Sequence, residues 1–271
     1  MIKVVVAGAG GRMGGRLIGL VKEASDLQLV GAVERKGHPM VGKDAGDVAG
    51  CGRIGVAVTD NLTALADRAE VLLDFTTPDV SLAHMEIMAT YQKTIVIGTT
   101  GLSARQLAEL QKLAKQIPCV YSPNMSVGVN VILKVLAEMA KTFGEDYDIE
   151  VTEAHHRLKK DAPSGTALKL AQVLADATGK DLDKVAAYGR KGMIGARKRG
   201  EIGIQVIRAG DIVGDHTVLF GGPGERVEVT HRAHSRDTFA RGALRAARWV
   251  VTQKPGLYDM HDVLGLKQGG H

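Results

Sequence analysis

Cysteine and aromatic residues are scarce in this sequence, and their scarcity excludes several classes of protein. The chain has 2 cysteines, and its aromatic content is 4%. Because Cys51 and Cys119 stand alone and far apart, they offer neither a disulfide framework nor the paired spacing of a metal site. We therefore expect a reduced, cytoplasmic protein with no bound metal.

Long apolar runs and a strong excess of one charge are also missing. No apolar stretch is long enough to cross a bilayer, and Met1 leads directly into a strand-like run, so we expect no membrane partner. The net charge is +5, and the densest basic cluster, residues 190–199, lies among glycines with few aromatics. This composition favours a solvated loop over a nucleic-acid site, so we expect no nucleic-acid partner.

The first part of the chain alternates short apolar runs with segments of helical periodicity. Strands are expected at residues 2–7, 27–33, 54–58, 71–75, 94–97 and 119–122, and helices at 13–21, 62–68, 79–90 and 104–115. Ser103 is expected to cap the last of these helices. Such alternation is typical of a doubly wound parallel sheet with helices on both faces.

The pattern changes near residue 124. Helices are expected at residues 129–143, 164–177 and 238–251, and strands at 148–154, 202–208, 216–220 and 226–231. Strands in succession without crossover helices predict a second, α+β domain with a mixed, mostly antiparallel sheet. We place the first domain at residues 1–126, resumed at 237–271, and the second at 127–236.

A glycine-rich turn joins the first strand to the first helix. Its residues are Gly8, Ala9, Gly10, Gly11, Arg12, Met13 and Gly14. Glycines here let the backbone approach a pyrophosphate, which rests on the amides of the helix start. A bare tight turn is the alternative, but the flanking strand and helix favour dinucleotide binding.

The cofactor type is open between NADH and NADPH. Glu34 ends the second expected strand, where an acid can accept the ribose hydroxyls, while Arg35 beside it can hold a 2′-phosphate. Loops after later strands leave the same sheet edge and are expected to contact the nicotinamide. Their residues are Phe75, Thr76, Thr77, Gly98, Thr99, Thr100, Ser122, Pro123, Asn124 and Met125.

A basic, histidine-rich segment precedes a helix start in the second domain. Five potential cations lie within residues 155–160, and Ser164, Gly165 and Thr166 then supply hydroxyls and free amides. A solvated charge cluster is the alternative. The neighbouring helix start favours a site for a small dicarboxylate substrate, with histidine as proton donor near neutral pH.

These motifs together resemble the 4-hydroxy-tetrahydrodipicolinate reductase (dihydrodipicolinate reductase) family. The matching segments are Val6–Gly14, Gly98–Gly101, Asn124–Asn130, Glu153–Ala167, Arg208–Gly214 and Gly256–Met260. The resemblance implies a Rossmann-like nucleotide domain completed by the last helix, and a homotetramer. It also implies reduction of (2S,4S)-4-hydroxy-2,3,4,5-tetrahydrodipicolinate with loss of water, in lysine and diaminopimelate biosynthesis.

The resemblance also assigns roles to residues of the basic segment. His155 corresponds to the proton donor or acceptor and Lys159 to the second proton donor. His156, Gly165 and Thr166 correspond to the groups that hold the substrate carboxylates. The sequence departs from the family at Leu158, where some members have a third histidine, and at Met125, where others have an aromatic residue.

Two other functions share the nucleotide half. A semialdehyde dehydrogenase would need a nucleophilic cysteine, and no cysteine follows residue 119. A nicotinamide-sensing regulator would bind cofactor without turnover, and gives no reason for the histidine-rich segment.

Overall fold

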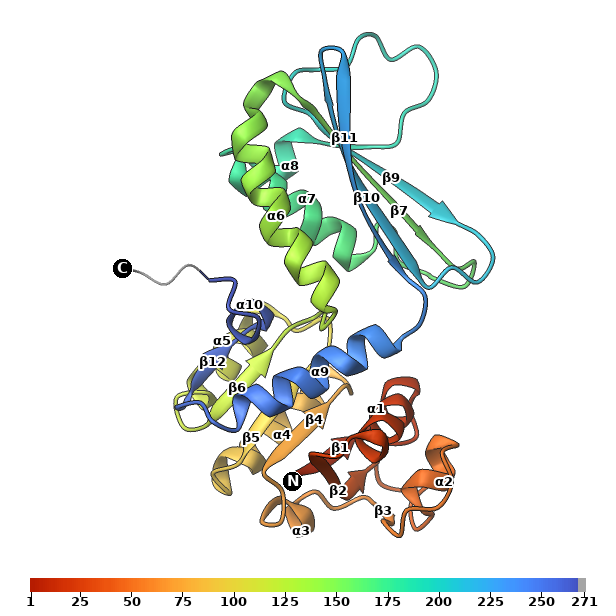
Figure 1. The fold of residues 1–271 in the computed structure, drawn as a ribbon, viewed down its shortest axis with the longest axis vertical. Helices are drawn as coiled ribbons and strands as arrows, with labels where there is room; N and C mark the ends of the chain where they lie inside the picture. Colours follow the sequence, from red (N-terminus) through yellow and green to blue (C-terminus); the bar gives the residue numbers. More distant parts are fainter. Residues whose placement is uncertain (268–271) are drawn as a thin grey trace. The chain divides into compact units, whose positions relative to one another are not determined.

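The computed structural model describes residues 1–267, and the chain folds into two compact units. The first unit comprises Met1–Val127 and the segment that begins at Arg236, and the second comprises Gly128–Ser235. Figure 1 shows the ribbon of each unit.

The first unit is built on a parallel sheet with the strand order β12-β6-β5-β4-β1-β2-β3. Its strands are β1 Ile2–Ala7, β2 Leu27–Val33, β3 Val58–Thr59, β4 Val71–Asp74, β5 Thr94–Ile97, β6 Pro118–Tyr121 and β12 Gly256–Tyr258. Its helices are α1 Arg12–Glu23, α2 Ala45–Ala49, α3 Thr63–Ala66, α4 Pro78–Thr90, α5 Ala104–Leu113, α9 Asp237–Val250 and α10 Met260–Val263. This order confirms the doubly wound parallel sheet.

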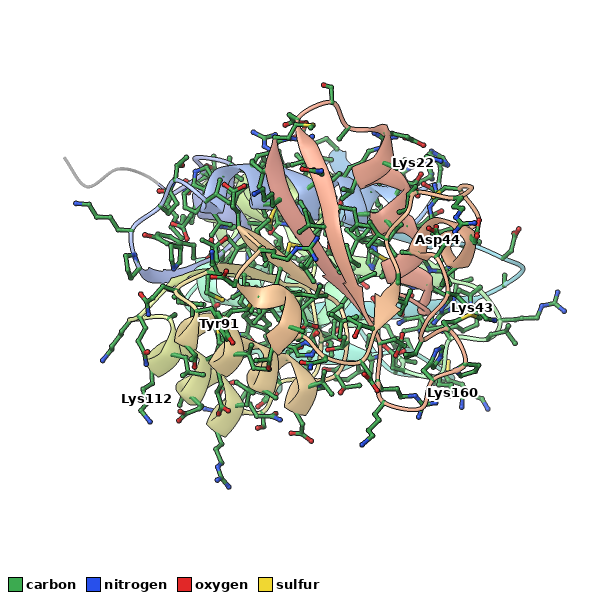
Figure 2. All side chains as sticks on the ribbon, turned by 90° about the horizontal axis from the view of Figure 1, so that it is seen from below. Lys22, Lys43, Asp44, Tyr91, Lys112 and Lys160 are labelled. Carbon is green, nitrogen blue, oxygen red and sulfur yellow. The ribbon has the colours of Figure 1, made fainter. Side chains whose placement is uncertain are left out.

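Alternate residues of β1 point to opposite faces of this sheet, and both faces are buried. Val4 and Val6 pack with α1 and α9, whereas Val5 packs with α4 and α5. Figure 2 shows the two layers, with Lys22 of α1 and Lys112 of α5 on opposite sides of the sheet. Gly242 lets α9 lie close against the loop after β6, because a Cβ on Gly242 would lie 1.7 Å from the Met125 carbonyl oxygen.

The second unit packs two long helices against one face of a mixed sheet (Figure 1). The strand order is β11-β10-β7-β9-β8, with antiparallel β10–β11 and β10–β7 pairs and parallel β7–β9 and β8–β9 pairs. The elements are α6 Val127–Phe143, η1 Gly144–Asp146, β7 Asp148–His155, α7 Gly165–Ala177, α8 Leu182–Val185, β8 Ala186–Tyr188, β9 Ile202–Arg208, β10 Gly214–Gly222 and β11 Glu225–Ala233. The mixed sheet predicted from the sequence is confirmed, but antiparallel pairs do not predominate, because β9 pairs in parallel with both β7 and β8.

One predicted strand is wrong in its bounds. The apolar run 54–58 contributes only Val58 to a strand, β3. The Asp44 carboxylate accepts the amides of Ile54 and Gly55, at 3.0 and 2.7 Å, and also the amide of Gly46, so this run forms a loop. The short elements without a counterpart among the expected elements are α2, η1, α8, β8, β12 and α10.

Candidate functional site

The glycine-rich turn is closely packed backbone. Gly8 follows β1 with a φ of 71°, and its carbonyl accepts the Gly11 amide at 2.9 Å. A Cβ on Gly14 would lie 2.0 Å from the Gly8 carbonyl oxygen, so only glycine fits there. Gly11 caps α1 without a side-chain bond, so no cap side chain occupies the amides of the helix start. This cradle fits a pyrophosphate, with Arg12 exposed beside it.

Glu34 follows β2 and reaches back to this turn. Its Oε2 accepts the Gly10 amide at 3.0 Å, and its Oε1 accepts the Arg35 amide at 2.9 Å. These two bonds fix the carboxylate at the edge of the turn and leave lone pairs for further donors. Arg35 is exposed. The pair therefore stands where sequence reasoning placed the ribose-binding acid and its basic neighbour.

His38 is a further residue at this position that sequence reasoning missed. A Cβ on Gly10 would lie 2.7 Å from His38 Cε1 and 3.2 Å from Glu34 Oε2, so ring and carboxylate gather over the same glycine. The His38 Nδ1 accepts the Met40 amide at 3.3 Å. The sequence shows only a histidine four residues beyond the acid, and no spacing rule indicates that the loop folds back.

The loop after β5 presents its residues differently. Thr99 is buried, and its hydroxyl contacts Ser81 Oγ at 2.7 Å, so it points into the unit. Thr100 is exposed. Gly98 lies against the Phe75 ring, which a Cβ would meet at 2.1 Å. Only the backbone of Thr99 is therefore available to contact a cofactor.

The loop after β6 is held by its own polar groups. Ser122 Oγ donates to the Asn124 carbonyl at 2.7 Å, and the Asn124 side-chain oxygen accepts the Ser126 amide at 2.9 Å. Pro123 is exposed, whereas the Met125 side chain is buried in the core of the first unit. A nicotinamide contact from the Met125 side chain would need that side chain to leave the core.

In the second unit, Glu153 of β7 is a buried carboxylate with three partners. It accepts a fork of two bonds from Arg208, both at 2.8 Å, and the Ser164 amide at 3.0 Å. It also contacts His155 Nδ1 at 2.6 Å. Burial raises the pKa of Glu153, but these bonds more than offset it, and the pKa lies below its usual value.

His155 ends β7 with its ring fixed by that contact. Burial lowers its pKa below the ordinary value, although Glu153 acts in the opposite direction. Because Nδ1 faces Glu153, Nε2 is the atom that can exchange a proton with a ligand. A Cβ on Gly214 would lie 3.0 Å from this Nε2, so the glycine keeps the space beside it open.

The start of α7 is anchored by Ser164 and His216. Ser164 Oγ accepts the Ala167 amide at 3.2 Å and contacts His216 Nε2 at 3.0 Å. Burial lowers the pKa of His216 to about 4, so its ring is neutral near pH 7. Gly165 and Thr166 follow, and a Cβ on Gly165 would meet nothing within 4 Å, which leaves the helix start open to an anion.

The remaining predicted residues lie in the turn between β7 and α7. Lys159 Nζ pairs with both carboxylate oxygens of Asp161, at 2.9 and 2.8 Å. His156 has a buried Nδ1 without a hydrogen-bond partner among residues 1–267, which suits a polar ligand. Leu158 is exposed. His155, His156, Lys159, Gly165 and Thr166 thus all lie between the end of β7 and the first turn of α7. The contacts of Glu153 with His155 and Ser164 tie the two ends of this segment together.

Sequence reasoning assigned no role to Glu153, Arg208 or His216. Glu153 and Arg208 lie within segments quoted for the family, and an acid two residues before a histidine on a strand puts both on one face. That spacing could have identified Glu153. Nothing local could have identified His216, which meets Ser164 across 52 residues of sequence.

The basic cluster at residues 190–199 lies in an exposed loop, as expected, with Arg197 alone partly buried. Arg190 pairs with Glu150 and Glu201, and Arg197 with Asp148 and Glu150, from β7 and the loop before β9. Local acids therefore neutralise part of its charge. In the described part of the chain no group of three metal-binding side chains gathers, and no helix has the length and apolarity to cross a bilayer.

Comparison with known families matches nearly the whole chain. The model of "Dihydrodipicolinate reductase, N-terminus" matches residues 2–125, and that of "Dihydrodipicolinate reductase, C-terminus" matches residues 128–264. A 4-hydroxy-tetrahydrodipicolinate reductase of Citrifermentans bemidjiense is 58% identical over 267 residues, covering 98% of this chain and 100% of the relative. One of Syntrophus aciditrophicus is 56% identical over the same shares.

A solved structure agrees. Dipicolinate-bound dihydrodipicolinate reductase from Paenisporosarcina sp. TG-14 has a TM-score of 0.76 and 26% identity, covering 96% of this chain and 97% of that one. GenD2 from gentamicin A biosynthesis, in complex with NAD, shares the fold at 17% identity and a TM-score of 0.60, covering 100% of this chain and 88% of that one. The resemblance noted from the motifs is thereby confirmed, and the chain belongs to the dihydrodipicolinate reductase family.

Proposed function

We propose that this chain reduces (2S,4S)-4-hydroxy-2,3,4,5-tetrahydrodipicolinate to tetrahydrodipicolinate with NADH or NADPH, in lysine and diaminopimelate biosynthesis. One hydride and one proton enter the substrate ring, and one water leaves. The observation that carries the proposal is the Glu153–His155 contact beside the open start of α7. It joins a proton-exchanging group to a site for anions on adjacent residues.

His155 is the proposed proton donor. Its Nδ1 is held by Glu153, so Nε2 can deliver a proton to the ring when hydride addition leaves negative charge there. Lys159 is the second candidate donor, and its pairing with Asp161 fixes the ammonium at the same turn. His156, Gly165 and Thr166 bind the two carboxylates through ring nitrogen, helix-start amides and hydroxyl.

The first unit holds the cofactor. The proposed contacts are Gly8, Ala9, Gly10, Gly11, Arg12 and Met13 with the pyrophosphate, Glu34 and Arg35 with the adenosine ribose, and residues 98–100 and 122–125 with the nicotinamide. A nicotinamide supplies the hydride when it is bound. The packed turn and the uncapped start of α1 support this placement.

The test is an absorbance assay of nicotinamide oxidation. The substrate is the aldol product of pyruvate and aspartate semialdehyde, made in the same cuvette. We expect oxidation that depends on both precursors and is inhibited by dipicolinate, a planar dianion. Cofactor binding without oxidation would instead favour a sensing protein.

The semialdehyde dehydrogenase alternative needs a nucleophilic cysteine, and Cys119 does not suit that role. Burial raises the pKa of the Cys119 thiol, and its side chain is enclosed in β6. Cys51 is partly exposed in a loop of the first unit. Full activity of the Cys51→Ser, Cys119→Ser double variant would exclude that reaction.

We also propose a cytoplasmic homotetramer in which residues 127–236 bind substrate and join subunits, while residues 1–126 and 237–271 bind cofactor. The sheet of the second unit supports the subunit contact, because β9 presents the half-exposed apolar side chains of Val206 and Ile207. Light scattering that reports a monomer would contradict the tetramer.

A further inference from the structure

Strand β4 ends in a carboxylate at the centre of the first unit's sheet. Asp74 is fully buried, and its neighbours in register are Ala7 of β1 and Ile97 of β5. The rest of β4 is Val71, Leu72 and Leu73. A buried acid is unfavourable unless its oxygens are satisfied, so its contacts show what the acid organises.

Both Asp74 oxygens are satisfied by side chains and backbone. Oδ1 accepts the Thr76 amide at 3.0 Å, the Thr76 hydroxyl at 2.6 Å and the Ser81 hydroxyl at 3.0 Å. Oδ2 meets His84 Nδ1 at 2.7 Å. Ser81 and His84 lie on α4, so one carboxylate ties the β4–α4 loop to the helix that follows it.

The same network extends to the next loop along the sheet. Thr99 Oγ1 contacts Ser81 Oγ at 2.7 Å and accepts the Thr76 amide at 3.1 Å. Two loops at the carboxyl edge of the sheet, after β4 and after β5, are therefore joined through Asp74. This edge is where dinucleotides bind in doubly wound folds.

Van der Waals contacts also join this network to the glycine-rich turn. A Cβ on Gly8 would lie 3.2 Å from the Thr76 methyl group, and the Phe75 ring covers Gly98. We propose that Asp74, braced by His84, is a positioning residue that sets the β4 and β5 loops for the nicotinamide half of the cofactor. This inference rests on the proposed function, because it assumes that the first unit binds a nicotinamide cofactor.

The test compares Asp74→Asn with a matched carboxylate at the opposite edge. An amide in place of Asp74 presents a donor to groups that are themselves donors. Glu70 precedes β4, and its Oε2 accepts the Lys3 amide at 2.9 Å, so Glu70→Gln makes the same chemical change away from the ligand edge. NADH affinity is measured by nicotinamide fluorescence, dipicolinate affinity by calorimetry, and melting temperature by circular dichroism.

We expect Asp74→Asn to weaken NADH binding by about tenfold or more, a loss on the order of 1.4 kcal/mol, with dipicolinate affinity unchanged. Glu70→Gln should leave both affinities at wild-type values. Should Asp74→Asn fail to fold, His84→Asn and Ser81→Ala remove single contacts and should show the same selective loss. Unchanged NADH affinity in folded Asp74→Asn, or equal loss for both ligands, would overturn the proposal.

The two proposals fail separately. NADH binding does not need turnover, so a wild-type chain that binds NADH but never oxidises it would reject the reductase function and leave the positioning role measurable. Rescue of NADH affinity in Thr99→Ser relative to Thr99→Val would further identify the hydroxyl contact as the cause.

Discussion

Each unit buries a carboxylate against a histidine Nδ1, Asp74 with His84 at 2.7 Å and Glu153 with His155 at 2.6 Å. The other partners differ. Glu153 pairs with the permanent positive charge of Arg208, whereas the remaining donors to Asp74 are an amide and hydroxyl groups. The guanidinium stabilises the ionised form of Glu153 beside His155, the histidine that we propose as the proton donor. The hydroxyl groups around Asp74 hold its carboxylate in place but carry no charge.

The two ligand sites differ in the same way. The predicted nucleotide site is mostly backbone, shaped by glycines such as Gly8 and Gly14 that bring chain segments into contact. The predicted substrate site is mostly side chains, and the pKa values of His155 and of its neighbours Glu153 and His216 are lowered from their usual values. Substitutions in the first unit should therefore act on binding geometry, whereas those in the second should act on protonation and on the charges and donors that face the substrate.

The sharpest test of this contrast is His155→Gln. We expect turnover to fall by roughly 10²–10⁴-fold, the usual range for loss of a general acid, with little change in NADH affinity. His84→Asn, its counterpart in the first unit, should alter NADH affinity instead. His234→Gln, at an exposed position, is the control. Near-normal turnover of His155→Gln would remove this assignment.

The second test uses pH and the buried His216. Its pKa falls from 6.5 to about 4 in the folded chain, so between these values the unfolded chain binds more protons and stability falls as pH decreases. The full loss below pH 4 is on the order of 3 kcal/mol. The melting temperature should therefore fall more between pH 8 and pH 4 in the wild type than in His216→Gln. Parallel curves would show that His216 is not buried in the neutral form.

The third test separates charge from hydrogen bonding at the substrate site. Lys159→Ala removes a cation that faces a dianion, and we expect substrate affinity to fall about 10- to 100-fold, with lower turnover. Thr166→Val removes one neutral donor but keeps the helix-start amides, so the Michaelis constant should rise by less, with turnover nearly unchanged. Wild-type affinity of Lys159→Ala for dipicolinate would place Lys159 outside the site.

Local signals predicted the parts of the fold that depend on neighbouring residues. The glycine turn follows from spacing between a strand and a helix, and Ser103 caps α5 as its position before the helix suggested, with its hydroxyl accepting the Gln106 amide. The histidine-rich segment was identified because its cations and the start of α7 adjoin in sequence.

The parts that were missed depend on contacts between distant residues. Arg208 meets Glu153 across 55 residues, and this contact needs β9 to pair in parallel with β7. Short strands such as β12 carry too few residues for a period, and the loop 54–58 is fixed by Asp44 ten residues earlier. Sequence patterns describe elements, whereas these contacts arise only when elements pack.

The smallest expected effect concerns cofactor choice. Glu34 should favour NADH, because the 2′-phosphate of NADPH would approach its carboxylate, and Arg35 offsets that repulsion only in part. We expect activity with both cofactors and discrimination of about tenfold or less, which corresponds to ~1.4 kcal/mol. Michaelis constants for both cofactors in Glu34→Ala and Arg35→Ala measure this directly.

Glu34→Ala should lose NADH affinity and keep or gain NADPH affinity, because the variant removes both the ribose acceptor and the like charge. It also releases the Gly10 amide that Oε2 now accepts, so part of the NADH loss can come from the turn itself. His38→Ala tests that part, because the His38 ring lies against Gly10 and its removal leaves Glu34 in place. Arg35→Ala should hurt NADPH more than NADH. If Glu34→Ala leaves the Michaelis constant for NADH unchanged, the ribose is bound elsewhere. The first unit then recognises the cofactor through its backbone alone.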